Sequence, residues 1–150
     1  MNLSPKKARS EWVKALRSGK YRQGTHVLRS TVDETYCCLG VACDLYSELE
    51  GNSMVKWKNN ISSSWEFLGH ICTLPNQVGR WLGITRPSFS EHLSSMNDSG
   101  KTFEKIADHI EMLEQVKDKE AAERSRQLTK LTDKHNLDKE VPTDEADQQA

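Results

Sequence analysis

Basic, aromatic and amide side chains gather directly after the first predicted helix of this chain. Arg17, Tyr21, Arg22 and Gln23 lie close together, and Arg29 follows a few residues later. Guanidinium groups bind phosphate through paired hydrogen bonds, and an aromatic ring can stack on a base. The cluster therefore has the composition of a site for a phosphorylated nucleotide. A solvated face beside a turn has the same composition, and both interpretations stay open.

A second polar segment, Ser95 to Thr102, ends in the Gly-Lys-Thr of a phosphate-binding loop. Ser95 stands where that motif requires its opening glycine, and a helix rather than a strand is predicted before the segment. We therefore do not expect a nucleotide-hydrolysing loop. Two interpretations remain. Either the amides of Gly100, Lys101 and Thr102 bind an anion at the start of the next helix, or a side chain of the segment caps that helix.

Four cysteines permit two further kinds of chemistry, a zinc site and a thiol nucleophile. Structural zinc prefers ligand pairs spaced C-x2-C, which the adjacent Cys37 and Cys38, with Cys43 farther along, do not supply. A nucleophilic thiolate needs a histidine and a carboxylate nearby, and a chain of this composition contains both by chance. The preferred interpretation is that these cysteines and Cys72 are reduced thiols packed in the core. No metal or other cofactor is predicted.

The elements that must position these groups are mainly helical. Apolar spacing and end signals predict a first helix that begins at Ser4-Pro5 and stops at Gly19, and a second that covers 39–46 and stops at Gly51-Asn52. A third helix opens at Pro75 and closes at Gly83. A fourth covers 88–96, and a fifth begins at Thr102. Short β-forming runs predict strands at 25–29, 35–37, 55–58 and 67–72, with a turn at 30–34 and a polar loop at 59–64.

These elements predict an α+β fold: a small, mainly helical domain with short β-hairpins, a long C-terminal helix and a disordered acidic tail. The compact domain is expected over residues 4–116, a charged helical extension over 117–134 and the tail over 135–150. The apolar stripe thins after Val116, with Leu128 and Leu131 as its last members. The low apolar fraction of 35% and the high charged fraction of 29% fit a compact part joined to a solvated part.

Charge and hydropathy exclude several classes of partner. The formal net charge is −1, without the basic stripe that duplex nucleic acid requires, so no duplex nucleic acid is expected. No apolar run approaches the length of about 20 residues that spans a bilayer, so no membrane is expected either. Lys6, Lys7 and Arg9 precede no apolar stretch, which argues against a secretory signal.

Several motifs occur in one order over approximately residues 10–111. They are W-V-x-A-L-R-S-G-x-Y-x-Q-G, Y-C-C-L-G-V-x-C-D-L, L-P, W-L-G and N-D-S-G-K-T-F-x-x-I-A-D-x-I-E. In this combination the chain resembles a family of small accessory proteins of tailed phages. The resemblance implies a location in the host cytoplasm and a role in blunting host defences or redirecting a host protein.

Three functions follow as hypotheses. The first is a non-enzymatic counter-defence protein that sequesters a nucleotide-derived host signal. The second is a protein-binding module that inhibits or redirects a host protein through its surface and C-terminal helix, a helix that is also a candidate for self-association. The third is a small enzyme that uses Cys37 or Cys38. For the first function, the predicted ligand-binding residues are Arg17, Tyr21, Arg22, Gln23, Arg29, Asn97, Asp98, Gly100, Lys101 and Thr102. The identity of the ligand or host target and the oligomeric state do not follow from the sequence.

Overall fold

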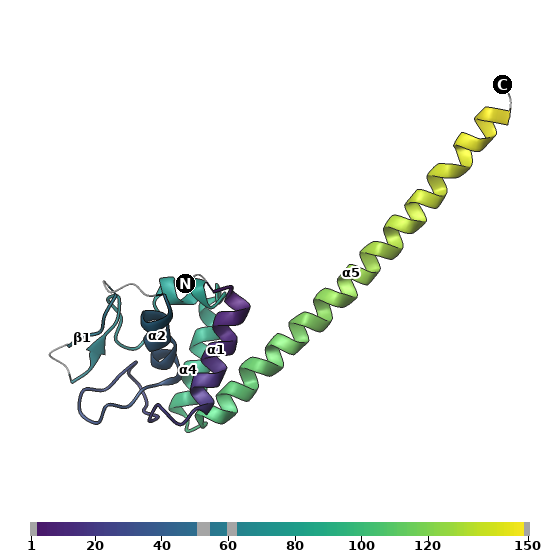
Figure 1. The fold of residues 1–150 in the computed structure, drawn as a ribbon. Helices are drawn as coiled ribbons and strands as arrows, with labels where there is room; N and C mark the ends of the chain where they lie inside the picture. Colours follow the sequence, from purple (N-terminus) through teal and green to yellow (C-terminus); the bar gives the residue numbers. More distant parts are fainter. Residues whose placement is uncertain (1–2, 51–54, 60–62, 149–150) are drawn as a thin grey trace. The chain divides into compact units, whose positions relative to one another are not determined.

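The computed structural model describes residues 3–50, 55–59 and 63–148, and the side chains within these ranges as far as residue 135. The chain forms two compact units, Met1–Glu111 and Met112–Ala150. The elements are α1 (Pro5–Arg17), α2 (Cys38–Leu49), β1 (Lys58–Asn59), β2 (Trp65–Glu66), α3 (Asn76–Trp81), α4 (Pro87–Asp98) and α5 (Phe103–Gln148) (Figure 1). Helices dominate and one short antiparallel hairpin accompanies them, which confirms the predicted α+β fold.

Helix α1 begins and ends where its sequence signals predict. Ser4 caps the start, because its Oγ accepts a hydrogen bond from the Lys7 amide at 3.3 Å, and Pro5 takes the first helical position. The chain leaves the helix through Gly19, whose φ of 76° lies in the left-handed region that glycine tolerates. The helix buries one apolar face, made of Ala8, Trp12, Val13 and Leu16.

Helix α2 lies at the centre of the core and packs against α1, α3 and α4. The indole Nε1 of Trp12 donates a hydrogen bond to the Cys38 carbonyl at 2.9 Å, which joins α1 to α2 inside the core. Gly40 lets α2 approach the backbone of the preceding loop, because a Cβ at this position would collide with the Leu28 carbonyl oxygen. The central helix is therefore built from small and apolar residues that allow close contact on several sides.

The predicted strands require the main correction. Among the described residues, regular strand pairing is confined to β1 and β2, with Lys58 opposite Glu66 and Asn59 opposite Trp65. The strands predicted at 25–29, 35–37 and 67–72 are wrong, and the one predicted at 55–58 begins only at its last residue. In their place the chain forms single bridges, such as that of Arg29 with Tyr36.

Backbone conformation explains why these runs do not extend into strands. His26 and Leu68 have φ values of 72° and 50°, which interrupt an extended chain inside two of the predicted strands. The backbone bonds are also spread over several partners, as when the Leu28 amide donates to the Ile71 carbonyl at 2.7 Å. The predicted helix stop at Gly51-Asn52 and the middle of the predicted loop at 59–64 lie outside the described residues.

Helices α3 and α4 follow each other closely along the chain, and both pack against α2. Pro75 is the residue before α3 rather than its first helical residue, and Gly83, at φ 70°, ends the turn after α3. Helix α4 is longer at both ends than the predicted range of 88–96. It buries Leu93 and Asn97 and leaves the rest of its surface partly or fully exposed.

Helix α5 begins at Phe103, one residue after the predicted start at Thr102, and its first turns bury Phe103, Ile106, Ala107 and Ile110. In the second unit it exposes the apolar side chains of Met112, Val116, Leu128 and Leu131. The bounds of the helix reach Gln148, but the side chains of residues 136–150 lie outside the described part of the chain. The disordered tail at 135–150 therefore stays a prediction, and so do the domain limits at 116 and 134.

None of the helices within the described residues combines the length and the apolar character that crossing a membrane demands.

Candidate functional site

The cluster that follows the first predicted helix and the polar segment Ser95 to Thr102 meet through the side chains of Gln23 and Asn97. Gln23 Nε2 donates to Asn97 Oδ1 at 3.0 Å and to the Lys101 carbonyl at 2.7 Å. Gln23 Oε1 accepts from the Phe103 amide at 3.0 Å, so the same side chain also holds the first residue of α5. We call these contacts the Gln23–Asn97 junction. It joins the loop after α1 to the turn between α4 and α5.

Asn97 is the buried centre of this junction, with 0% of its surface exposed. Its Oδ1 also accepts from the Cys38 amide at 3.2 Å, and its Nδ2 donates to the Gly24 carbonyl at 2.8 Å. A buried amide with both ends paired stabilises one arrangement of the chain, because leaving any of these groups unpaired would be costly. The geometry gives Asn97 a structural role and leaves it no surface for a ligand.

The turn between α4 and α5 is organised in the same way. Gly100 adopts φ 98°, and the Lys101 amide donates to the Met96 carbonyl at 3.0 Å. Thr102 Oγ1 accepts from the Lys105 amide at 3.3 Å and so caps α5. Of the two interpretations of this segment, the geometry favours the cap. The side chains of Lys101 and Thr102 are exposed.

Arg17 has carboxylate partners from within the first unit. It contacts Glu111 at 2.6 Å and Asp108 at 2.5 Å, both on the first turns of α5. Hydrogen bonds from the guanidinium to Glu111 and then Asp108 raise the pKa of Arg17 above its ordinary value. Arg17 therefore pairs α1 with α5 instead of presenting its charge to an anion. Arg22, by contrast, has an exposed side chain.

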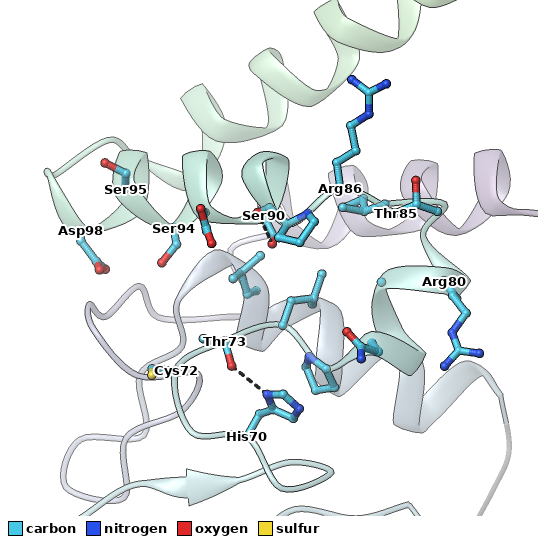
Figure 2. Close-up of a pocket in the computed structure, with 18 of the residues that line it drawn as sticks. His70, Cys72, Thr73, Arg80, Thr85, Arg86, Ser90, Ser94, Ser95 and Asp98 are labelled. Carbon is cyan, nitrogen blue, oxygen red and sulfur yellow. Dashed lines mark hydrogen bonds between the residues drawn. The ribbon is translucent and has the colours of Figure 1, made fainter.

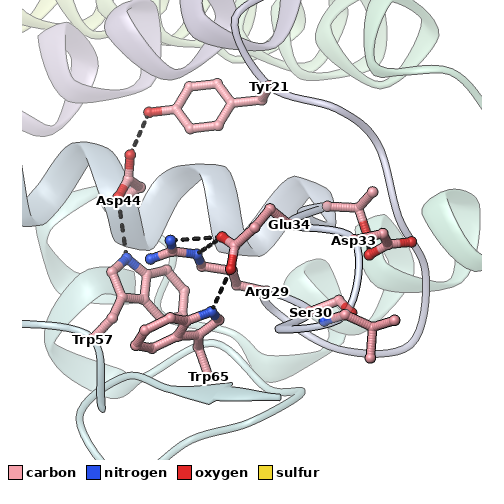
Figure 3. Close-up of polar contacts among 10 residues, drawn as sticks. Tyr21, Arg29, Ser30, Asp33, Glu34, Asp44, Trp57 and Trp65 are labelled. Carbon is pink, nitrogen blue, oxygen red and sulfur yellow. Dashed lines mark hydrogen bonds and ion pairs between the residues drawn. The ribbon is translucent and has the colours of Figure 1, made fainter. Parts of the chain in front are cut away.

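Arg29 is held among aromatic rings (Figure 3). Its Nε and Nη2 donate to Glu34 Oε2 at 2.9 and 2.7 Å, and its guanidinium carbon lies 4.4 Å from the centre of the Trp65 ring. Tyr36 and Trp57 also face it, at 5.3 and 5.5 Å. Desolvation opposes ionisation of Glu34, but hydrogen bonds from Arg29 and Trp65 outweigh it and lower the pKa of this carboxyl.

Tyr21 forms a neighbouring cluster with Asp44, also drawn in Figure 3. The Tyr21 hydroxyl donates to Asp44 Oδ2 at 2.7 Å, and the Trp57 indole donates to Asp44 Oδ1 at 3.1 Å. Burial and the hydrogen bond to Asp44 both raise the pKa of Tyr21. The predicted site residues Arg17, Tyr21, Gln23, Arg29 and Asn97 thus all have partners inside the chain. Arg17 pairs with α5, and Gln23 pairs with Asn97. Tyr21 and Arg29 both contact the Tyr36 ring.

A large cavity lies elsewhere, between α4 and the segment that leads into α3. Its volume is about 960 Å³, and among the predicted site residues only Asp98 lines it. We call it the α4 cavity. Its lining residues are Leu39, His70, Cys72, Thr73, Leu74, Pro75, Asn76, Gly79, Arg80, Ile84, Thr85, Arg86, Pro87, Ser90, Glu91, Ser94, Ser95, Asp98 and Ser99.

One side of the α4 cavity is polar and regular. Ser90, Ser94 and Asp98 recur every four residues, so they share one face of α4, and Figure 2 shows Ser94 and Asp98 pointing into the cavity. Asp98 Oδ1 accepts from the His26 amide at 2.9 Å, which fixes the orientation of the carboxylate. Among the described residues, the Ser94 hydroxyl has no hydrogen-bond partner.

The floor and the far end of the cavity differ from this polar side. Leu39 and Pro75 are buried and contribute apolar surface, with Leu74 and Ile84 beside them. Figure 2 shows Arg80 and Arg86 at the end opposite Asp98, with both side chains extended away from the centre. Their guanidinium groups are exposed, and no described residue forms an ion pair with them.

The cysteines divide between the core and this cavity. Cys37, Cys38 and Cys43 are buried and unpaired. Burial raises the pKa of Cys37 to about 11 and the pKa values of Cys38 and Cys43 well above the ordinary thiol value, so all three thiols are protonated at neutral pH. The core interpretation is wrong for Cys72, which is exposed and lines the α4 cavity.

Two other features bear on chemistry at this cavity. His70 Nδ1 lies 2.7 Å from Thr73 Oγ1, so a hydroxyl of the chain engages that nitrogen. Among the described residues, no group of three or more His, Cys, Asp or Glu side chains is placed to hold a metal ion.

Sequence reasoning missed the α4 cavity because its residues match no familiar motif. A signal was nevertheless present: hydroxyl or carboxyl groups stand at 90, 94 and 98 and again at 91, 95 and 99, both at helical spacing. On a predicted helix, such a pattern indicates a polar face beside the apolar one. The floor could not be anticipated, because it comes from α2 and from residues 74–84, which only the tertiary fold brings under α4.

Fold and cavity together define a small α+β protein with a polar cavity beside its fourth helix. The chain belongs to the family described as Domain of unknown function (DUF8296), whose model matches residues 4–114. No curated protein and no solved structure matches the chain.

Proposed function

We propose that this protein sequesters a nucleotide-derived signal molecule in the α4 cavity, without catalysis, and acts as a counter-defence protein of a phage. One observation carries the proposal. The α4 cavity combines an apolar floor, a row of hydroxyl and carboxyl groups, and two arginines without ion-pair partners among the described residues. The resemblance to accessory proteins of tailed phages supports the counter-defence setting.

The parts of the cavity correspond to the parts of a nucleotide. The apolar floor around Leu39 and Pro75 suits a base, and the polar row of α4 suits a sugar. Arg80 and Arg86 suit a phosphate, because guanidinium groups bind phosphate oxygens in pairs. Both arginine side chains must turn inward to do so. Pockets for small molecules have volumes of about 300 to 1,000 Å³, and the α4 cavity lies within that range at about 960 Å³.

The burial of the thiols supports binding without catalysis. The two cysteines of the third hypothesis, Cys37 and Cys38, are buried and have raised pKa values, so neither supplies a thiolate at neutral pH. Sequestration needs affinity alone, which the cavity groups can provide by hydrogen bonds and charge.

Isothermal titration of the protein with a panel of linear and cyclic nucleotides tests the proposal. We expect at least one nucleotide to bind and to be recovered unchanged after denaturation of the complex. Arg80→Ala and Arg86→Ala should each weaken binding by about 1.5 to 3 kcal/mol, the typical value of a charge-assisted hydrogen bond.

Arg22→Ala is the matched control, because it removes an exposed arginine outside the α4 cavity. If Arg22→Ala or Arg29→Ala weakened binding while Arg80→Ala and Arg86→Ala did not, the ligand would lie at the site predicted from the sequence. If no nucleotide of the panel binds, the proposal is wrong.

A second candidate function is protein binding through α5. The observation in its favour is the exposure of Leu128 and Leu131, at 59% and 65%, in the second unit. Apolar side chains one helical turn apart are the usual anchors of a partner helix. A pull-down with the full chain, compared with the Leu128→Ser and Leu131→Ser variants, tests this function. If the full chain and both variants recover every captured protein equally, protein binding through Leu128 and Leu131 is wrong. Sedimentation of the same three proteins tests self-association.

A further inference from the structure

The carboxylate of Asp98 is the most specific group in the α4 cavity. Its Oδ1 accepts from the His26 amide at 2.9 Å and from Asn97 Nδ2 at 3.4 Å. Oδ2 has no partner among the described residues. One carboxylate oxygen is thus held by the fold, and the other stays available on a side chain that points into the cavity (Figure 2).

The residues that donate hydrogen bonds to Asp98 are themselves fixed by the fold. His26 adopts φ 72°, in the left-handed region, and its amide donates to Asp98 Oδ1 on α4. Asn97, the residue before Asp98, is the buried centre of the Gln23–Asn97 junction. Because both neighbours are fixed, the carboxylate is oriented before any ligand arrives, and orienting a group beforehand lowers the cost of binding.

Ser94 stands one helical turn before Asp98 on the same face of α4, and both line the cavity. A carboxylate accepts hydrogen bonds and donates none at neutral pH, whereas a serine hydroxyl can do either. The pair therefore suits a ligand that offers two neighbouring hydroxyl groups. In nucleotides, this arrangement is the 2′,3′-diol of ribose.

We propose that the α4 cavity selects ribonucleotides with a free 2′,3′-diol and with phosphate on the 5′ side. This inference rests on the proposed function and specifies its ligand. Asp98 and Ser94 bind the diol at one end, and the phosphate extends toward Arg80 and Arg86 at the opposite end. A 2′-deoxynucleotide lacks one of the two hydroxyl groups. A 3′,5′-cyclic nucleotide has its 3′ oxygen esterified, so it also lacks a free diol.

The experiment compares the affinities of ADP, GDP, CDP and UDP with those of their 2′-deoxy counterparts and of 3′,5′-cyclic AMP, by isothermal titration with the full chain. We expect at least one ribonucleoside diphosphate to bind at least about tenfold more tightly than its deoxy form, the loss that one hydrogen bond to a charged group implies. We expect 3′,5′-cyclic AMP to bind more weakly than ADP.

Asp98→Asn is the decisive variant. It keeps an oxygen for the His26 amide but replaces the available carboxylate oxygen with a donor, so the preference for ribose over deoxyribose should disappear. Its unfolding midpoint shows whether the fold is retained. Ser94→Ala, which leaves Asp98 in place, should reduce the preference and serves as a second variant if Asp98→Asn fails to fold. Glu91→Gln is the matched control: it neutralises another carboxyl of the α4 cavity and should leave the preference unchanged.

The outcomes separate this inference from the proposed function. If ribonucleotides and deoxynucleotides bind equally and Arg80→Ala weakens both, nucleotide sequestration stands and diol recognition is overturned. An unchanged preference in both Asp98→Asn and Ser94→Ala likewise overturns the assignment of these residues. If none of the nine nucleotides binds, the diol inference is overturned. The wider nucleotide panel then decides the proposed function by itself.

Discussion

The Gln23–Asn97 junction and the α4 cavity lie next to each other, since Asn97 belongs to one and Asp98 to the other, yet they use polar side chains in opposite ways. In the junction, the Gln23 and Asn97 amides are paired with groups of the chain. In the cavity, Ser94 and Arg80 have no hydrogen-bond or ion-pair partners among the described residues. Residue type alone therefore does not make a binding site. What matters is hydrogen-bonding capacity that the fold leaves accessible.

The physical reason lies in burial. A buried polar group without a partner costs about 1 to 3 kcal/mol, so a group placed in the core must be paired by the chain itself. An exposed hydroxyl or guanidinium is solvated, and a ligand can replace that water at little cost. Substitutions in the junction should therefore affect stability, and substitutions in the cavity should affect binding.

The largest effect is expected from Gly40→Ala in the packed core. The added Cβ would collide with the Leu28 carbonyl oxygen, a backbone atom held close to α2. We expect a loss of about 4 kcal/mol or more in the free energy of unfolding, measured by urea denaturation. Gly69→Ala is the control, because its Cβ meets open space and its φ of 82° alone should cost about 1 kcal/mol. Equal losses for the two variants would contradict this account of α2 packing.

Asn97→Ala should have the next largest effect. It leaves the Cys38 amide and the Gly24 carbonyl without the partners that they have now. We expect a loss of about 3 kcal/mol, the sum of two modest penalties for unpaired buried groups. Ser95→Ala, at an exposed position of the same helix, should change the free energy of unfolding by less than about 0.5 kcal/mol. A stable Asn97→Ala protein would show that the junction is dispensable.

Arg29→Lys is expected to cost about 1 kcal/mol at pH 7, because lysine loses the two-nitrogen contact with Glu34 and the close contact with the Trp65 ring. The pKa of Glu34 is lowered in the folded state, so this contribution is present above the unfolded-state pKa of about 4.3. It is lost as the pH falls through the lower folded value. The difference in the free energy of unfolding between Arg29→Lys and the parent protein should therefore shrink as the pH falls below the unfolded-state pKa of Glu34. Arg22→Lys should show no difference from the parent protein at neutral or at acidic pH.

Ser94→Ala tests the comparison at a residue of the α4 cavity and has the smallest expected effect on the free energy of unfolding. Its hydroxyl has no hydrogen-bond partner among the described residues, so the free energy of unfolding should stay within about 0.5 kcal/mol of the parent value. Urea denaturation measures this directly. A loss above about 1 kcal/mol would mean that Ser94 belongs to the packed structure, and the distinction between the two regions would fail there.

Some of the fold could be predicted because local signals determine it. Ser4 and Pro5 start α1 and Gly19 ends it, as capping chemistry requires. The apolar spacing from Phe103 to Ile110 likewise places the buried face of α5. Strands were predicted less well, because a strand exists only through its partner. The run at 25–29 has β-forming composition, but its hydrogen bonds go to several separate segments.

In the candidate site too, the residue types could be predicted from the sequence, but the partners of these residues could not. Gln23 and Asn97 are both predicted as ligand-binding residues, but the structure pairs them with each other, which no pattern in the sequence shows. Arg17 and Arg29 have the chemistry of phosphate ligands, but Glu111 and Glu34 are their partners. The same arginine, with the same helical or turn context, would be open for a ligand if those carboxylates lay elsewhere.

By itself, the sequence determined the ends of α1, the buried faces of α1 and of the first turns of α5, and the inventory of groups able to bind an anion, because these depend on residues within a few positions of one another. Only the tertiary structure decided which of those groups remain accessible. Contacts between distant residues, such as the amide of His26 with Asp98 or the backbone of Leu28 with Gly40, consume some polar groups and orient others. Beside α4, the fold leaves the Ser94 hydroxyl and the guanidinium groups of Arg80 and Arg86 without such partners among the described residues.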